Sequence, residues 1–277
     1  MLTAQLQPIL SKNMSVILEG GCFVSDWREN TPVVSGTFSE RKVIGRSTGA
    51  QAISLRILEF GQGLSPGLQT GNADEVLYVL EPADNPGDYR CDIFIDGRRH
   101  EAAPQTGVYL RPGETLAVRN ERNNPVVLVS CQCPESSDSR IVDSITEPPT
   151  ALDHQVNPLV RLADREAIPT ADRWYRVLVD DEVGSRQVTQ FVGSIPPGRA
   201  PDHFHNYEEV LFILRGEGRM WAGQTNTPIG PGSCVYLPRR QMHCVENTGT
   251  GELRLLGVFY PAGSPAVRYE SSQSGIS

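Results

Sequence analysis

The stretch that decides the fold reads PGRAPDHFHNYEEV and covers residues 197–210. It contains His203 and His205, and Glu209 follows four positions after His205. Because successive side chains of a β-strand point to opposite faces, these residues project to the same side if the chain stays extended. A third histidine, His243, lies in a later strand-like segment. Imidazole and carboxylate groups that converge on one point suit Fe, Mn, Ni, Cu or Zn, so the sequence predicts a metal site.

The same residues carry a resemblance to the cupin superfamily, whose motifs read G-x5-H-x-H-x3,4-E-x6-G and G-x5-P-x-G-x2-H-x3-N. The first motif is matched, with one residue fewer before the first histidine, by Gly198, His203, His205, Glu209 and Gly216. The second is matched by Gly232, Pro238, His243 and Asn247, with Arg240 where the family usually has glycine. This resemblance implies that His203, His205, Glu209 and His243 are the four ligands of one metal inside a small β-barrel.

Composition limits the classes of partner. The chain has 277 residues, which suggests two domains of ordinary size. Its net charge is −8, and Lys and Arg form no cluster, which argues against a nucleic-acid partner. The first ten residues do not have the pattern of a signal peptide, and no window approaches the roughly 20 apolar residues of a membrane span. We therefore expect a cytoplasmic protein that acts on a small molecule, with no membrane or nucleic-acid partner.

The six cysteines include no C-x-x-C pair, and a chain of this length does not need a disulfide framework. We expect reduced, buried thiols that act as small apolar residues. The cysteines are Cys22, Cys91, Cys131, Cys133, Cys234 and Cys244.

Short apolar runs separated by Gly and Pro predict an all-β protein. In the first half we expect strands at 52–60, 75–80, 91–95, 107–110, 115–119 and 126–131. In the second half we expect them at 174–179, 187–195, 209–214, 218–222, 233–237, 243–246 and 253–260.

The two halves of the chain repeat each other. The segment DEVLYVL at 74–80 corresponds to EEVLFIL at 208–214, and VYL at 108–110 corresponds to VYL at 235–237. A repeat of this length indicates a duplicated domain, so we expect two tandem jelly-roll-like cupin barrels. We predict an N-terminal barrel over residues 1–140, a linker over 141–169 and a C-terminal barrel with the metal over 170–277.

The repeat also indicates what the first half lacks. Alignment of Glu75 with Glu209 places Gln69 and Gly71 where the second half has His203 and His205, and Leu116 falls at the position of His243. One carboxylate beside an amide and a leucine holds a transition metal poorly. We therefore expect a degenerate, metal-free N-terminal barrel.

Four protein ligands leave open positions on a metal that prefers five or six. The leading hypothesis is a dioxygenase-type oxidoreductase. The alternatives are a non-oxidative metalloenzyme, such as an isomerase, aminohydrolase or decarboxylase, and a non-catalytic cupin that binds a small ligand. The candidates for acid–base or substrate-binding roles are Tyr207, Glu208, Tyr236 and Gln241. Exposed sheet edges also make a homodimer a reasonable expectation.

Overall fold

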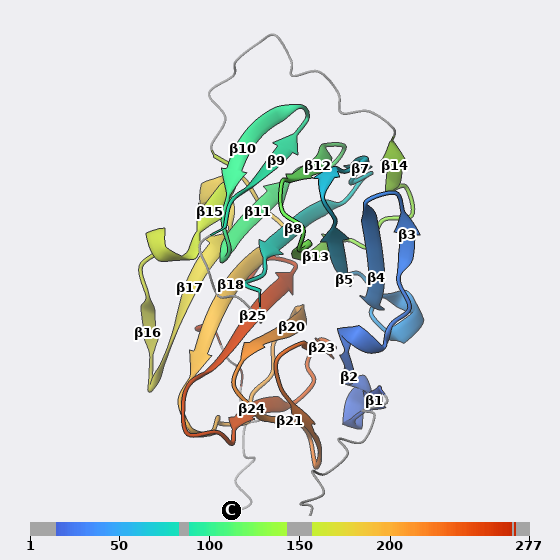
Figure 1. The fold of residues 1–277 in the computed structure, drawn as a ribbon. Coiled ribbons are helices and arrows are strands. Elements are labelled where there is room, and N and C mark those ends of the chain that lie inside the picture. The colour runs from blue at the N-terminus through green and yellow to red at the C-terminus, as the bar shows by residue number, and fades with distance from the viewer. Residues whose placement is uncertain (1–14, 83–88, 143–156, 268, 270–277) are drawn as a thin grey trace, which may run out of the picture.

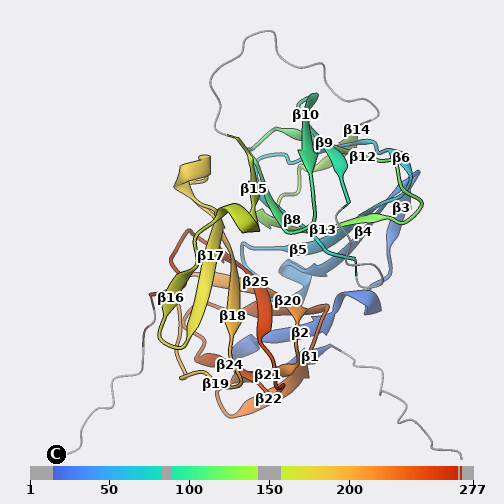
Figure 2. The same ribbon diagram turned by 60° about the vertical axis from the view of Figure 1, so that its left-hand side comes forward.

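The fold consists of β-strands joined by short turns and by single turns of 3-10 helix. The computed structural model describes residues 15–82, 89–142, 157–267 and 269. Figures 1 and 2 show two β-barrels, with the first half of the chain forming the upper one and the second half forming most of the lower one. This confirms the predicted all-β, two-barrel architecture.

The C-terminal barrel consists of a large and a small antiparallel sheet. The large sheet has the order β1-β2-β23-β20-β25-β18-β17-β16 and the small one β19-β24-β21-β22. The large sheet contains β1 (Val16–Ile17), β2 (Phe23–Asp26), β16 (Ile168–Thr170), β17 (Arg173–Val179), β18 (Thr189–Ile195), β20 (Glu208–Arg215), β23 (Ser233–Leu237) and β25 (Leu253–Tyr260). The small sheet contains β19 (Gly198–Arg199), β21 (Gly218–Ala222), β22 (Thr225–Ile229) and β24 (His243–Asn247).

The N-terminal barrel repeats this plan. Its large sheet has the order β15-β11-β8-β13-β5-β4-β3, and its small sheet the order β10-β9-β12-β7-β14, with β6 paired to β12. The large sheet contains β3 (Val33–Ser35), β4 (Phe38–Ile44), β5 (Leu55–Phe60), β8 (Asp74–Val79), β11 (Thr106–Leu110), β13 (Val126–Cys133) and β15 (Leu159–Arg161). The small sheet contains β6 (Gly63–Leu64), β7 (Gly67–Gln69), β9 (Cys91–Ile95), β10 (Arg98–Ala102), β12 (Thr115–Asn120) and β14 (Arg140–Val142).

The 3-10 turns lie in the connections between strands. They are η1 (Glu19–Gly21), η2 (Trp27–Glu29), η3 (Arg46–Thr48), η4 (Leu162–Asp164) and η5 (Asp181–Val183).

Each barrel has its own core, and a third core joins the two. Alternate residues of β20 show the division: Leu211 packs inside the C-terminal barrel, whereas Val210 and Phe212 pack against the N-terminal barrel. The same period of two places Val76 and Tyr78 of β8 in the shared core and Leu77 inside the N-terminal barrel. Strands buried on both faces therefore read as continuous apolar runs, which explains why the sequence revealed them.

Two segments lie in a different part of the fold from the one that the sequence predicted. Strands β1 and β2, at residues 16–26, belong to the C-terminal sheet, where β2 pairs with β23, although residues 1–140 were expected to form the N-terminal barrel. Strand β15, expected in the linker, pairs with β11 in the N-terminal sheet. Residues 83–88 and 143–156, which contain most of the predicted insertion and linker, lie outside the described residues. The barrel boundaries themselves stay a prediction.

Every strand expected from the sequence is present, with ends shifted by at most three residues. Most of the strands that the sequence did not reveal are short or lie at sheet edges; β4, with seven residues and a place inside its sheet, is an exception. Strand β3 exposes Val33 and Val34, and β10 carries the charged run RRHEA at 98–102. Such segments bury too little apolar surface to produce an alternating pattern.

Candidate metal centre

Two segments of backbone bring the histidines together. His243 begins β24, and His203 lies in the connection between β19 and β20. The N–H of each of these residues donates to the carbonyl of the other, at 3.0 and 2.8 Å. His205 lies two residues further along this connection, and Glu209 follows on β20. The bridge between residues 203 and 243 therefore joins the two motifs that are forty residues apart.

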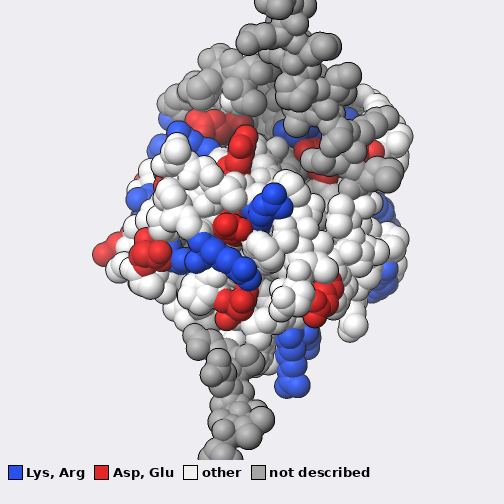
Figure 3. All heavy atoms as spheres, turned by 90° about the horizontal axis from the view of Figure 1, so that it is seen from below, with Lys and Arg blue, Asp and Glu red and all other residues white. Residues whose placement is uncertain are grey.

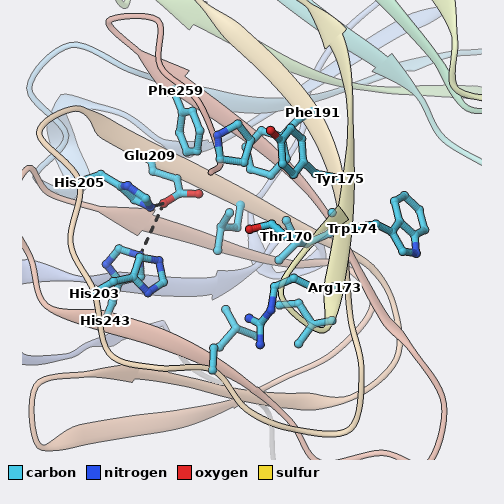
Figure 4. A pocket seen from close by; sticks show the side chains of 17 residues that line it. Thr170, Arg173, Trp174, Tyr175, Phe191, His203, His205, Glu209, His243 and Phe259 are labelled. Atoms are coloured by element: carbon cyan, nitrogen blue, oxygen red, sulfur yellow. Dashed lines mark ion pairs between the residues drawn. The ribbon is translucent and has the colours of Figure 1, made fainter. Parts of the chain in front are cut away.

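The four side chains converge as the spacing predicted. One ligand atom from each of His203, His205 and His243 lies within 4.8 Å of the others. Oε2 of Glu209 lies 3.7 Å from Nε2 of His205 and 3.6 Å from Nε2 of His243. Figure 4 shows the three imidazoles and this carboxylate grouped at one end of a pocket. Ligands held about 2.0–2.2 Å from one metal lie roughly 3–4 Å from each other, so this donor set fits a single ion.

Backbone carbonyls orient two of the rings. The Nδ1 atom of His243 lies 2.7 Å from the carbonyl oxygen of Gln241, and that of His203 lies 3.0 Å from the carbonyl oxygen of Pro201. A ring that donates from Nδ1 keeps the lone pair of Nε2 for a metal. The surroundings thus select the metal-binding tautomer of both histidines.

Burial gives this group of side chains unusual electrostatics. Burial raises the pKa of Glu209 to about 8, and no lysine or arginine in the described part of the chain forms an ion pair with it. Burial also lowers the pKa of His243 well below its usual value, and His203 adds to this effect. A buried carboxylate next to His243, whose neutral form is favoured, lacks a compensating cation, which a divalent metal would supply. The three-histidine group with Glu209 could therefore hold a divalent metal.

Arg240, which replaces the usual glycine of the second motif, keeps the turn. Its φ is +61°, in the left-handed region that disfavours residues with a Cβ by roughly 1–2 kcal/mol. Its backbone N–H donates to the carbonyl of His205 at 2.7 Å, and its Nε donates to Asn206 Oδ1 at 3.4 Å. Arg240 therefore supports the segment that carries a ligand.

An apolar pocket extends from the metal-ligand group into the C-terminal barrel. The volume of this cavity is about 90 Å³. Its apolar wall is formed by Phe191, Ile195, Leu211, Val245, Leu255 and Phe259. Polar side chains lie elsewhere on the wall: Thr170, Arg173 and Tyr175, which Figure 4 shows across the pocket from the imidazoles. The sequence did not identify these three residues, because only the fold brings the β16–β17 hairpin to this site.

Of the four residues predicted to assist the reaction, Tyr207 contacts a metal ligand. Its ring stacks on His205 with centroids 4.8 Å apart and an interplanar angle of 13°. Its hydroxyl donates to the carbonyl of Ser264 at 3.0 Å. Burial, with a smaller contribution from Glu209, raises the pKa of Tyr207. Tyr207 thus holds the His205 ring, and its phenol points to Ser264.

Gln241 contributes to the site through its backbone. Its carbonyl accepts from His243, whereas its side-chain amide donates to the carbonyl of Met242 at 2.9 Å.

Glu208 and Tyr236 do not reach the pocket, which corrects their expected place at the site. As neighbours of Glu209 and Leu237, they point to the opposite face of the sheet. The Tyr236 hydroxyl donates to Glu208 Oε1 at 2.5 Å. The Glu208 carboxylate also accepts from the backbone N–H groups of Gln51 and Ala52 at 2.8 Å and of Ile53 at 3.2 Å. These two residues therefore join the barrels.

The N-terminal barrel offers no comparable group among its described residues, since the three histidines above are the one cluster of possible ligands found. Gln69 is instead hydrogen-bonded to Gly113 and Arg140, and Leu116 is buried in the core of the barrel. All six cysteines are free and buried, which confirms that prediction.

The surface of the described residues does not test the predictions about partners. On the face drawn in Figure 3, acidic and basic side chains are interspersed. Within the described ranges, no helix combines the length and apolar character that a membrane crossing requires. Edge strands β1 and β3 expose Ile17, Val33 and Val34. The absence of a nucleic-acid or membrane partner, the cytoplasmic location and the homodimer stay predictions.

Comparisons with known proteins agree with this geometry. The cupin domain family matches residues 191–259, which contain all four predicted ligands. Auxin-binding protein 1 of Arabidopsis thaliana is 30% identical over 83 residues, which cover 26% of this chain and 42% of that protein. The uncharacterized protein MJ1618 of Methanocaldococcus jannaschii is 33% identical over 54 residues, or 20% and 43% of the two chains. The chain thus matches less than half of the length of these curated relatives.

Solved structures show the same arrangement of two barrels. An oxalate decarboxylase of Bacillus subtilis with Mn(II) centres has a TM-score of 0.68 at 15% identity, and the likeness covers 87% of this chain and 78% of that one. A deletion mutant of the same enzyme has a TM-score of 0.67 at 16% identity, with coverage of 86% and 76%. The family match over residues 191–259, the motifs and the two-barrel fold together support a bicupin-type cupin protein.

Proposed function

We propose that the chain is a metal-dependent enzyme that acts on a small molecule in the C-terminal barrel. The observation that carries this proposal is the convergence of His203 with the buried His205, Glu209 and His243 at the end of an apolar pocket. Two rings are already oriented for ligation through Nε2, and the carboxylate lacks an arginine or lysine partner among the described residues. Structural sites are usually fully coordinated, whereas a pocket beside the ligands leaves room for a substrate.

The reaction that the pocket favours is oxidation by O2. A redox-active divalent metal held by the four side chains would supply open coordination positions for a substrate oxygen atom and for O2. The chain itself provides an apolar wall, formed in part by Phe191, Leu255 and Phe259, against which an apolar substrate would displace water. Glu209 is the single carboxylate among the described lining residues, and as a ligand it is not free for proton transfer. Hydrolysis usually uses a free carboxylate or imidazole as general base, and the described lining offers neither besides the predicted ligands.

A non-oxidative reaction is the second candidate. The phenol of Tyr175 lies on the pocket wall and would be the proton donor for a decarboxylation or isomerisation. The fold resembles that of oxalate decarboxylase, which is compatible with a decarboxylation. At 15% identity this likeness supports the fold alone and not the reaction. A binding protein without turnover is the third possibility, since one relative is named for binding auxin.

The test is an O2-uptake assay with protein that has been reconstituted with Fe(II) under anaerobic conditions. Small phenols, diketones and carboxylic acids are added in turn, and O2 consumption and product formation are followed together. We expect uptake with at least one substrate and none with the His205→Ala or His243→Ala variants. Product formation without O2 consumption, in the presence of Mn(II) or Zn(II), would overturn the oxidation in favour of the second candidate. Tight binding with no product under either condition would overturn both.

A further inference from the structure

A tight hairpin places two polar side chains over the apolar pocket. Thr170 at the end of β16 pairs with Arg173 at the start of β17, so Ala171 and Asp172 alone form the turn. Ala171 adopts a φ of +57°, as a two-residue hairpin of this kind requires. Side chains alternate along β17, and Figure 4 shows Trp174 directed away from the pocket that Arg173 and Tyr175 line. The hairpin thus fixes the side of the sheet to which Arg173 belongs.

Arg173 is largely buried for a residue at a hairpin turn. Its side chain is 11% exposed, and its Nε donates to Oδ1 of Asp172 at 2.9 Å. Asp172 is 61% exposed, so water weakens this ion pair. A guanidinium carries five N–H donors in a planar fork, and this contact uses one of them. An arginine held at an apolar wall in this way retains donors for an anion inside the pocket.

The charges around the pocket favour an anionic ligand. With a metal bound, the ligand Glu209 is ionised, and Arg173 and Glu209 then carry the formal charges among the described lining side chains. The positive charges of a bound divalent metal and Arg173 exceed the negative charge of Glu209, so a ligand with one or two negative charges would restore neutrality. The separation of charges matters as well: the cation of Arg173 lies across the pocket from the metal ligands, so a ligand can contact both ends.

The volume limits the size of this ligand. A cavity of about 90 Å³ is well above the roughly 10–15 Å³ that one water needs, and it suits a small molecule. A ligand of about ten non-hydrogen atoms or fewer fills such a space. Most of its surface has to be apolar to match Phe191, Leu255 and Phe259.

We propose that Arg173 binds the anionic group of a small organic acid and thereby selects the substrate, with Thr170 as an additional hydrogen-bond donor. The acid has an apolar body that spans the pocket, and its far end faces the three imidazoles. This inference rests on the proposed function only in taking the ligand to be the substrate. It assigns Arg173 a positioning role that the motifs of the sequence did not indicate.

Benzoate and its neutral counterpart benzamide provide the test. Full-length protein is loaded with Zn(II), its metal content is measured, and binding of each probe is followed by calorimetry. We expect benzoate to bind at least about tenfold more tightly than benzamide. Because a hydrogen bond to a charged group is lost, Arg173→Gln should weaken benzoate binding by about 10- to 100-fold and change benzamide binding by less than about threefold. Arg173→Lys should retain part of the preference, since it keeps the charge without the fork.

Two further variants make the result specific. Arg219→Gln removes the same charge from an exposed position of the same barrel and should leave the preference for benzoate unchanged. Unfolding temperatures and metal contents within error of the wild type show that Arg173→Gln leaves the barrel intact. An undiminished benzoate preference in Arg173→Gln overturns the proposal, because the metal alone would then bind the carboxylate. Failure of the Zn(II)-loaded wild type to bind benzoate, propionate or acetate also overturns it.

The outcome separates this inference from the proposed function, because Zn(II) does not support oxidation by O2. If Arg173-dependent binding occurs and O2 uptake does not, the oxidation is lost and the anion site remains. If O2 uptake occurs with neutral substrates and is indifferent to Arg173→Gln, the oxidation remains and the anion site is lost.

Discussion

The two barrels contain the same buried carboxylate in two different surroundings. Glu75 on β8 pairs in register with Leu110, and Glu209 on β20 pairs with Leu237, so the two residues occupy equivalent positions. Both are buried, at 3% and 5% exposure. A carboxylate in such a position needs a positive partner or hydrogen-bond donors, because burial otherwise costs several kcal/mol. The barrels differ in where this partner comes from.

In the N-terminal barrel the protein supplies the cation. Arg56 donates from Nη2 to Glu75 at 2.7 Å and from Nη1 to Glu40 at 2.8 Å. Although burial acts to lower the pKa of Arg56, the two carboxylates outweigh this effect and raise it. Ser130 and Gln132 donate further hydrogen bonds to Glu75, at 2.6 and 3.1 Å. This network fills the space in which the other barrel has its pocket.

In the C-terminal barrel the equivalent positions carry apolar residues. Arg56 pairs with Ser130, as Phe191 pairs with Gly257, and Gln132 lies opposite Glu75 as Phe259 lies opposite Glu209. The arginine, serine and glutamine are thus replaced by phenylalanine, glycine and phenylalanine. A Cβ at Gly257 would lie 2.3 Å from the Phe191 ring, so glycine makes room for that ring. Removal of the protein cation creates an apolar cavity and leaves Glu209 available to a metal.

The largest difference should appear in metal content. We expect one divalent metal per chain, and His205→Ala and His243→Ala should bind it at least about 100-fold more weakly, since even outer hydrogen-bond partners of metal ligands contribute 10- to 100-fold. Elemental analysis after dialysis measures this. Glu75→Gln is the matched control in the other barrel and should retain the full content. A second metal that disappears with Glu75→Gln would contradict the assignment of a metal-free N-terminal barrel.

The second prediction concerns the protein cation. Arg56→Met leaves Glu75 and Glu40 without their partner, and removal of one member of a buried ion pair lowers the free energy of unfolding by about 3–5 kcal/mol. Urea denaturation measures the loss, and metal content should not change. Arg99→Met is the control, because Arg99 is 64% exposed where it contacts Asp92 and should contribute less than about 1 kcal/mol.

The double variant Arg56→Met with Glu75→Leu sharpens this test. It should recover part of the stability, since an apolar pair of similar volume replaces the buried Arg56–Glu75 ion pair at little cost, while the partly buried Glu40 still lacks its partner. Arg56→Met alone should lower the free energy of unfolding more than Arg99→Met does. If it did not, the Arg56 network would not stabilise Glu75 in the way that a metal is expected to stabilise Glu209.

A smaller effect is expected where the barrels meet. Glu208 accepts hydrogen bonds from Tyr236 and from three backbone N–H groups of the N-terminal barrel, whereas the equivalent Asp74 accepts one from Tyr109 at 2.6 Å. Glu208→Gln should therefore lower the free energy of unfolding by about 2–3 kcal/mol and Asp74→Asn by about 1 kcal/mol. Thermal or urea unfolding of both variants gives the comparison. Equal losses would mean that the backbone contacts to Glu208 add little.

The histidine group was predictable from sequence because three of its four ligands lie within seven residues, and the spacing H-x-H fixes their common face. The buried strands were predictable because their apolar runs are continuous. Arg56 was not, because its role depends on the register between β5 and β13, which lie 74 residues apart at Arg56 and Ser130. Arg173 was not predictable either, because only the fold brings the β16–β17 hairpin to the pocket. The crossing of β1 and β2 to the other barrel also depends on long-range pairing that no local pattern reveals.

The smallest expected effect distinguishes packing from catalysis at Tyr207. The equivalent residue in the N-terminal barrel is Ala73, so the aromatic ring over His205 is specific to the barrel with the metal ligands. Tyr207→Phe keeps the ring and removes the hydrogen bond to the Ser264 carbonyl, which should lower the free energy of unfolding by about 0.5–1.5 kcal/mol. Metal affinity, measured by competition with a chelator, and turnover should stay within about twofold. A loss of turnover with unchanged metal affinity would instead show that the phenol takes part in the reaction, as its position next to the ligands first indicated.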